Sequence, residues 1–262
     1  MILRLGVFGL CLVALLGWEA RRPARPPDRR RWAGNFALGV LDAVLLRLTM
    51  AGGLAGVAAW GQAAGAGVLD GGWAALAVGL VALDLAVYLQ HRVLHRVPWL
   101  WRWHRVHHTD DCVDVSTALR FHPVEALLSL AVKAAVVLAI GVPPAGALAF
   151  ELWLSACALF NHANAHLPPA AERWLRPVLI TPDLHRIHHS VREREHHSNF
   201  GFSVCWWDRL FGSWCPRPHG GEDALRLGLA DRPGPRRLIA LLTEPFSGPS
   251  GPARPTTSEV PP

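Results

Sequence analysis

The chain has 262 residues, of which 51% are hydrophobic, and its mean hydropathy is +0.22. Soluble domains are usually less apolar, so the composition indicates a membrane protein. The net charge of +6 comes almost entirely from arginines at the ends of apolar runs, which is typical of topology determinants rather than of a nucleic-acid-binding surface. Five cysteines without a C-x-x-C pair argue against a disulfide framework and against a zinc–thiolate site.

Five apolar runs predict five membrane-spanning helices, at residues 2–18, 32 to about 60, 73–90, about 126–142 and about 145–160. No small-residue cleavage site follows the first run, which favours a membrane helix over a signal peptide. Basic residues that flank a span stay in the cytoplasm. We therefore expect the N-terminus outside, the C-terminus inside, and a cytoplasmic anchor made of Arg21, Arg22, Arg25, Arg29, Arg30 and Arg31.

The second run contains two charged residues, Asp42 and Arg47. Charges inside a span are costly and normally face other protein or water. The expected arrangement is an ion pair within one helix or between helices.

Ten of the fourteen histidines fall in four short clusters. An H-x-x-x-H pair follows the third span and another follows the fifth, and an H-x-x-H-H cluster comes after each pair. With five spans, all four clusters lie on the cytoplasmic side. The sequence thus predicts an all-α integral membrane protein with about five transmembrane helices and a cytoplasmic, helical, His-rich metal domain. The predicted ligands are His91, His95, His104, His107, His108, His162, His166, His185, His188 and His189.

Neutral imidazole binds iron, zinc and copper. Ten imidazoles give two metals about five ligands each, which leaves a six-coordinate ion one open position for dioxygen. A structural zinc needs four ligands and no open position. The pattern therefore favours a redox pair, with two iron ions as the leading candidate and zinc as a metal that the site can hold after isolation.

Several neighbours of the histidines are candidates for holding the imidazole rings in place. Asp84 and Tyr88 share a helical stripe with His91 and His95, and Glu151 shares one with His162. Asn161 and His122 are further candidates, and for His122 a supporting or helix-entry role is favoured over ligation. We expect the remaining histidines to be ordinary packed or interfacial residues: His196, His197 and His219.

Six blocks between about Tyr88 and Ser213 resemble, in order, the fatty acid hydroxylase / sterol desaturase superfamily of membrane enzymes. They read HRVLH, WHRVHH, RFHPVE, FNHANAHLP, TPDLHRIHHS and SNFGFSVCWWDRLFG. The resemblance implies a di-iron oxygenase that uses dioxygen and external electrons to hydroxylate an unactivated C–H bond of a fatty acyl chain or sterol-like lipid, with the ten histidines as ligands. The sequence departs from the family pattern at His196 and His197, where the family more often has acidic residues. The resemblance also implies a separate electron donor, cytochrome b5-like or ferredoxin-like.

Other functions remain open. A desaturase acting on a sterol or similar lipid and a carotenoid hydroxylase belong to the same chemical class. A metal transporter would need ligands near the middle of the spans, and a bis-histidine haem carrier would leave most of these histidines unused. A zinc hydrolase motif, H-E-x-x-H, is absent.

The expected organisation has three parts. Residues 1–72 form an N-terminal transmembrane region with the Arg-rich cytoplasmic linker, and residues 73–215 form the catalytic domain. Residues 216–262 form a tail, which is rich in Pro, Ser, Gly and Thr from about residue 244 and is expected to be largely disordered there.

Overall fold

The computed structural model describes residues 2–69, 72–231, 234 and 237–248. Within these residues the regular secondary structure is helical, and isolated bridges take the place of strands. The prediction of an all-α protein is confirmed. All five cysteines are free, as expected.

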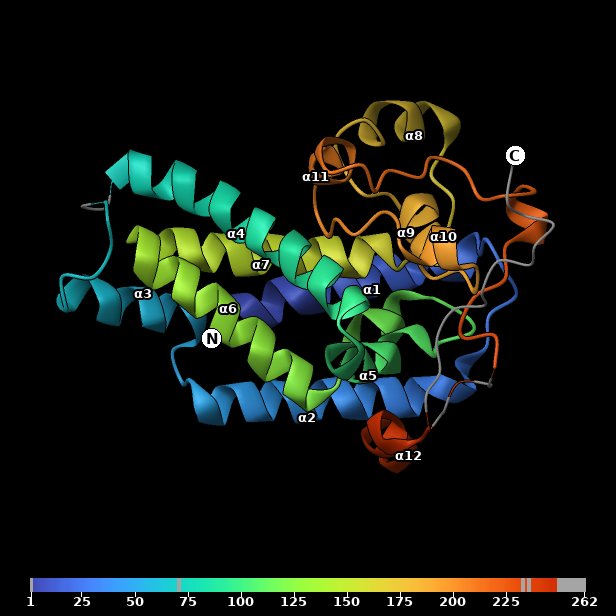
Figure 1. Ribbon diagram of the computed structural model, residues 1–262, viewed down its shortest axis with the longest axis horizontal. Helices are drawn as coiled ribbons and strands as arrows, with labels where there is room; N and C mark the ends of the chain where they lie inside the picture. The colour runs from blue at the N-terminus through green and yellow to red at the C-terminus, as the bar shows by residue number, and fades with distance from the viewer. Residues whose placement is uncertain (1, 70–71, 232–233, 235–236, 249–262) are drawn as a thin grey trace.

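Six helices form an elongated bundle (Figure 1): α1 (Ile2–Arg21), α2 (Trp32–Thr49), α3 (Gly53–Ala63), α4 (Gly72–Arg96), α6 (Pro123–Ile140) and α7 (Pro144–Asn161). In the described part of the chain, five segments are long and apolar enough to cross a membrane: 3–21, 29–63, 72–96, 123–140 and 144–161. The prediction of five spans is confirmed, and the protein is an integral membrane protein.

The second of these segments is broken between α2 and α3. As one helix, its 35 residues would be about 52 Å long, well beyond the roughly 30 Å of a bilayer core. The break falls at a glycine pair, and Gly53 has φ +60°, a conformation that favours glycine. The break allows α3 to pack against α6 and α7.

The expected ion pair between Asp42 and Arg47 does not form among the described residues. Asp42 is 8% exposed and faces the interior, whereas Arg47 is exposed. Residues five apart on a helix do not share a face, which explains why the two side chains separate.

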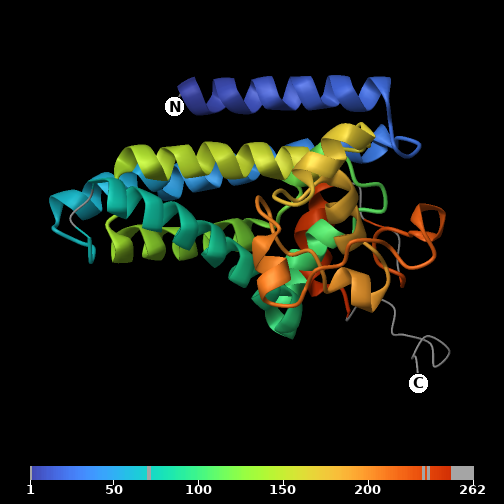
Figure 2. The same ribbon diagram turned by 90° about the horizontal axis from the view of Figure 1, so that it is seen from above.

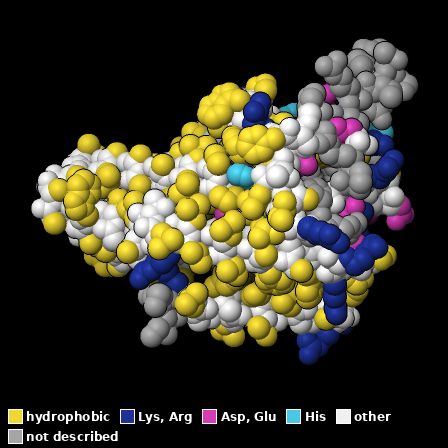
Figure 3. Space-filling view, turned by 90° about the horizontal axis from the view of Figure 1, so that it is seen from below, with side chains coloured by type: hydrophobic (Ala, Val, Ile, Leu, Met, Phe, Trp, Pro, Cys, Tyr) yellow, Lys and Arg dark blue, Asp and Glu magenta, His cyan; other side chains and the backbone are white. Residues whose placement is uncertain are grey.

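The bundle core lies where α3, α4, α6 and α7 meet, around Leu54, Leu83, Val137 and Phe150. Helix α1 packs against α7 and lies along one edge of the bundle (Figure 2). Large apolar side chains stay exposed on α1 and α2, as a lipid-facing surface requires. Figure 3 shows apolar side chains over one face of the bundle, with charged side chains gathered toward one end.

Shorter elements cover one end of the bundle (Figure 1), and six of the fourteen histidines lie on them. They are α5 (Pro98–His108), α8 (Pro169–Leu175), α9 (Pro182–His188), α10 (Glu193–His196), α11 (Trp206–Leu210), α12 (Leu238–Thr243) and the 3-10 turns η1 (Arg29–Arg31), η2 (Val115–Leu119), η3 (Glu222–Ala224) and η4 (Glu244–Phe246). The η4 turn lies inside the segment expected to be disordered from about residue 244. Residues 249–262 lie outside the described residues.

One arginine of the Arg-rich linker is fully buried. Arg31 is 1% exposed and forms ion pairs with Asp110 and Asp114. The linker is therefore fastened to the segment that follows α5 by a buried charge network.

Candidate metal centre

Nine of the ten predicted ligands come together in two adjacent buried groups. The first histidine group consists of His91, His95, His104, His108 and His188. The second histidine group consists of His107, His162, His185 and His189. Within each group, one ring nitrogen from every residue lies within 4.8 Å of the others. Both groups can hold a metal ion.

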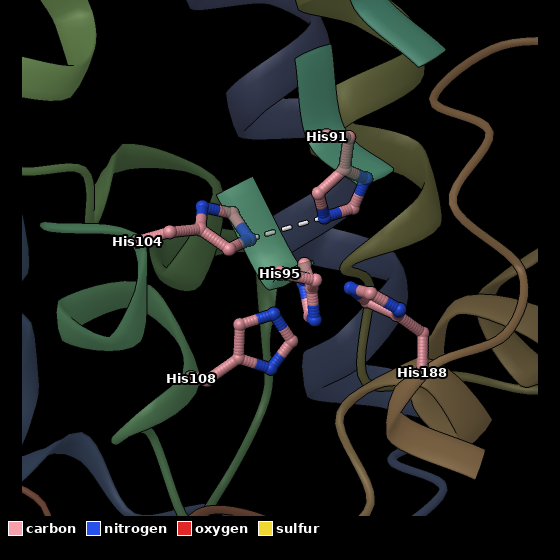
Figure 4. Close-up of side chains that lie close together, drawn as sticks. All are labelled: His91, His95, His104, His108 and His188. Atoms are coloured by element: carbon pink, nitrogen blue, oxygen red, sulfur yellow. Dashed lines mark hydrogen bonds between the residues drawn. The ribbon is translucent and has the colours of Figure 1, made fainter. Parts of the chain in front are cut away.

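Three helices supply the first histidine group. His91 and His95 lie one turn apart at the end of α4, His104 and His108 lie one turn apart on α5, and His188 ends α9. Figure 4 shows the five rings turned toward one shared space. The i, i+4 spacing places each pair on one face of its helix. The histidines of α5 belong to both groups, because His107 points to the second group.

Four of the histidines are held at Nδ1, which leaves Nε2 free to face the centre. His91, His162 and His188 donate to the backbone carbonyls of Phe200, Ala158 and Ser198, at 2.7, 2.6 and 2.7 Å. His104 donates to the Glu125 carboxylate at 2.7 Å. Metal-ligating histidines are usually oriented by such a bond from the other ring nitrogen.

The spacing of the Nε2 atoms fits metal ligation. The Nε2 atoms of His91 and His104 are 3.0 Å apart, and that of His162 is 3.0 Å from those of His107 and His185. Two nitrogens bound at about 2.1 Å to one metal at a right angle lie roughly 3.0 Å apart. Among the described residues, both ring nitrogens of His95 and His108 are buried without a hydrogen-bond partner, which is costly unless a ligand satisfies them. The residues present thus fit a metal pair.

Burial favours the neutral form of the imidazoles in the second histidine group. It lowers the pKa of His162 to about 4, and burial together with neighbouring imidazoles lowers the pKa of His107, His185 and His189 well below the usual value. The lone pairs needed for metal binding are therefore available at neutral pH.

The structure does not bring His166 to either group. Its side chain is 49% exposed, and its Nδ1 lies 2.8 Å from Asp183. The H-x-x-x-H spacing of His162 and His166 gives one helical face only while the helix continues. Because α7 ends at Asn161, the two rings separate.

Two of the predicted supporting residues hold the 200–213 segment instead of a histidine ring. Asp84 accepts hydrogen bonds from Ser203 and from Trp207, the latter at 2.7 Å. The Tyr88 hydroxyl lies 2.8 Å from Ser213 Oγ. The same segment carries the Phe200 carbonyl, which accepts a hydrogen bond from His91.

The other three candidates also lie off the metal groups. His122 caps α6 by accepting from Val124 N at 3.1 Å, which matches the helix-entry role. Asn161 donates to the Phe202 carbonyl at 2.8 Å. Glu151 forms an ion pair with Arg4.

Two residues of the site were not predicted. Glu125, in the RFHPVE block, orients His104. His196 is fully buried beside the first histidine group, with its ring centroid 4.6 Å from that of His95 and 4.5 Å from that of His108. Neither of its ring nitrogens has a hydrogen-bond partner in the described part of the chain. Two sequence features could have indicated them. Glu125 is a glutamate in the first turn of a span, and His196 belongs to the H-H pair at 196–197.

A cavity of about 610 Å³ joins the membrane bundle to the first histidine group. Residues from α1, α2, α4, α6 and α7 line it, and it reaches His91 and His104. Its walls are mostly apolar, with Phe8, Leu46 and Leu159 among them. Such a cavity suits a lipid chain.

Apolar spans that end in a buried polyhistidine centre define a membrane protein of the histidine-rich metal class. A sequence model of the fatty acid hydroxylase family matches residues 76–213, which include every histidine of both groups. The chain belongs to this family.

Known relatives are lipid-oxidising enzymes by name. The ornithine lipid hydroxylase OlsE of Rhizobium tropici is 30% identical over 65% of this chain and 50% of its own length. The alkylglycerol monooxygenase of Danio rerio is 28% identical over 52% of this chain and 29% of its own length. A cholesterol 25-hydroxylase-like protein of Danio rerio is 33% identical over 53% of this chain and 54% of its own length. The chain spans about half the length, or less, of these relatives. No solved structure matches it significantly.

Proposed function

We propose that the protein is a membrane-bound lipid hydroxylase. The observation that carries the proposal is the cavity, which opens from the apolar bundle directly onto His91 and His104. A lipid chain in this cavity would present a C–H bond beside the first histidine group. The names of the relatives, hydroxylases and monooxygenases, support the same reaction class.

In this proposal the two histidine groups hold two iron ions, which when bound supply the activation of dioxygen for attack on an unactivated C–H bond. The chain's own residues prepare the site. Glu125 and the carbonyl groups of Phe200, Ser198 and Ala158 fix the orientation of four imidazoles. The apolar wall of the cavity excludes water and aligns the lipid.

The source of the electrons and the orientation of the protein in the membrane are also part of the proposed function. The electrons come from a separate cytochrome b5-like or ferredoxin-like protein, and the histidine groups and the C-terminus lie in the cytoplasm. Residues 73–215 form the catalytic domain between the N-terminal transmembrane region, 1–72, and the tail, 216–262. Histidines at the ends of the spans, rather than at their middle, support an enzyme over a transporter.

Lipid analysis by mass spectrometry tests the proposal. Cells that express the chain should accumulate a lipid heavier by one oxygen atom, and cells with the His104→Ala variant should not. A lipid lighter by two hydrogens would identify a desaturase instead. No change in either direction would overturn the proposal.

A further inference from the structure

Three oxygen acceptors at the metal end of the cavity have no hydrogen-bond partner among the described residues. They are Oδ1 of Asp42, Oε1 of Gln90 and Oε2 of Glu125, and all three atoms are buried. All three residues line the cavity. Buried acceptors are normally satisfied, so three together in one cavity point to a ligand that supplies donors.

These acceptors come from three helices that line the same cavity, and two of them adjoin histidines of the first group. Gln90 precedes His91 on α4, Glu125 holds His104 from the first turn of α6, and Asp42 faces inward from α2. Figure 4 shows His91 and His104 facing each other, and both residues line the cavity.

The chemistry of the three acceptors favours a cation. Two carboxyl groups and one amide line the cavity with an unpartnered buried oxygen, and Asp42 has no ion-pair partner in the described residues. A primary ammonium offers three donors and no acceptor, which matches three acceptor oxygens, and it offsets the carboxylate charge. A lone hydroxyl supplies one donor, and a carboxylate supplies none.

The opposite end of the cavity carries the opposite charge. Lys133 lines it there, eight residues beyond Glu125 on α6 and thus about 12 Å away along the helix axis. Arg4 is also present but is neutralised by Glu151. The positive charge of Lys133 repels the ammonium group of a bound lipid. The ammonium group is therefore directed to the metal end, and the apolar chain lies along the cavity.

We propose that Asp42, Gln90 and Glu125 bind a primary ammonium group, and that the substrate is an amine-bearing lipid oxidised close to its amine. This inference rests on the proposed function, because it takes the cavity as the substrate site. Asp42 and Gln90 are the specificity-determining residues, and Glu125 contributes its second oxygen while it holds His104.

The test measures binding to the full-length, metal-loaded protein in detergent micelles, without oxygen or reductant. The probes are hexadecylamine, hexadecanol and hexadecanoate, which share one chain and differ in the polar group. The wild-type protein should bind the amine about 10-fold more tightly than the alcohol. Asp42→Asn should reduce amine affinity about 10-fold and change alcohol affinity less than about 2-fold.

Two further variants keep the result interpretable. Arg47→Gln removes a charge from the exposed face of the same helix, outside the cavity lining, and should leave all three affinities unchanged. Gln90→Met should weaken amine binding severalfold, which provides a second route if Asp42→Asn fails to fold.

The inference is overturned if hexadecanoate binds most tightly, which would assign recognition to Lys133, or if neither Asp42→Asn nor Gln90→Met weakens amine binding. Because no turnover occurs in this assay, its outcome is independent of the hydroxylation test. A protein that binds amines but oxidises no lipid would refute the proposed function and leave the ammonium-binding site standing.

Discussion

His104 donates a hydrogen bond from Nδ1 to the buried carboxylate of Glu125, with the two atoms 2.7 Å apart. This contact connects the histidine-bearing α5 to the first turn of the span α6. It also fixes the ring so that Nε2 faces His91. Such partners typically contribute 10- to 100-fold in metal affinity.

Removing this partner should therefore weaken metal binding. Glu125→Ala should lower the affinity of one of two bound metals about 10- to 100-fold, and Glu125→Gln, which keeps an acceptor oxygen, should lower it less. Metal content after dialysis against graded chelator measures this. The exposed Glu222 provides the control, since Glu222→Ala should retain full occupancy. Equal occupancy in all four proteins would show that the contact does not orient a ligand.

The two histidines of the second H-x-x-x-H pair should behave differently. His162 is fully buried in the second histidine group, whereas His166 is half exposed beside Asp183. His162→Ala should reduce bound metal from about two ions per chain to about one, and His166→Ala should keep two. Elemental analysis of the purified variants measures the number of metal ions bound per chain. Loss of metal in His166→Ala would mean that this side chain turns inward when metal binds.

The metal-free protein should lose stability as the medium becomes acidic. Burial lowers the pKa of His162 to about 4 in the fold, against about 6.5 in an unfolded chain. Between these values the unfolded state binds more protons, so stability falls as pH falls from about 6.5 to 4. His162 alone accounts for about 3 kcal/mol over that window.

Thermal unfolding of the metal-free protein at a series of pH values measures this effect. His162→Asn, which carries no titrating group at that position, should show a shallower decline below pH 6.5. A melting temperature that stays constant from pH 7 to pH 5 would contradict the assignment of a buried neutral imidazole.

Two neighbouring arginines should differ greatly in their contribution to stability. Arg31 is 1% exposed between Asp110 and Asp114, whereas the Arg30 side chain is 79% exposed beside Asp28. Arg31→Ala leaves two buried carboxylates without their partner and should cost about 3–5 kcal/mol. Arg30→Ala should leave the melting temperature nearly unchanged, because solvent screens its exposed ion pair with Asp28. Melting temperatures in one detergent compare the two, and similar losses would exclude a special role for the buried network.

The sequence located the spans and nine histidines of the two groups because both depend on short-range patterns. Long apolar runs specify membrane helices, and i, i+4 spacing places His91 with His95 whatever surrounds them. The same spacing failed for His166, because the helix stops one residue before His162. A spacing rule holds only within one continuous helix.

The residues that support the site could not be read from local spacing. Asp84 and Tyr88 share a stripe with His91, yet they bond to Ser203 and Ser213, more than 100 residues further along the chain. Glu125 reaches His104 because α6 packs beside α5, and this packing is a long-range property. Asp42 was expected to pair with Arg47, but only the assembled bundle shows that it faces a cavity.

The orientation in the membrane provides the last prediction. If the histidine groups are cytoplasmic, the loop between α3 and α4 lies outside, since it joins the ends of the bundle farthest from the histidines. A cysteine introduced at Gly65 should react with a membrane-impermeant maleimide in intact cells, and one introduced at Gly212 should react only after lysis. Both positions have positive φ and open space around them, so matched substitutions carry similar strain. Labelling in the reverse pattern would place the histidine groups on the outer side, where a cytoplasmic electron donor cannot reach them.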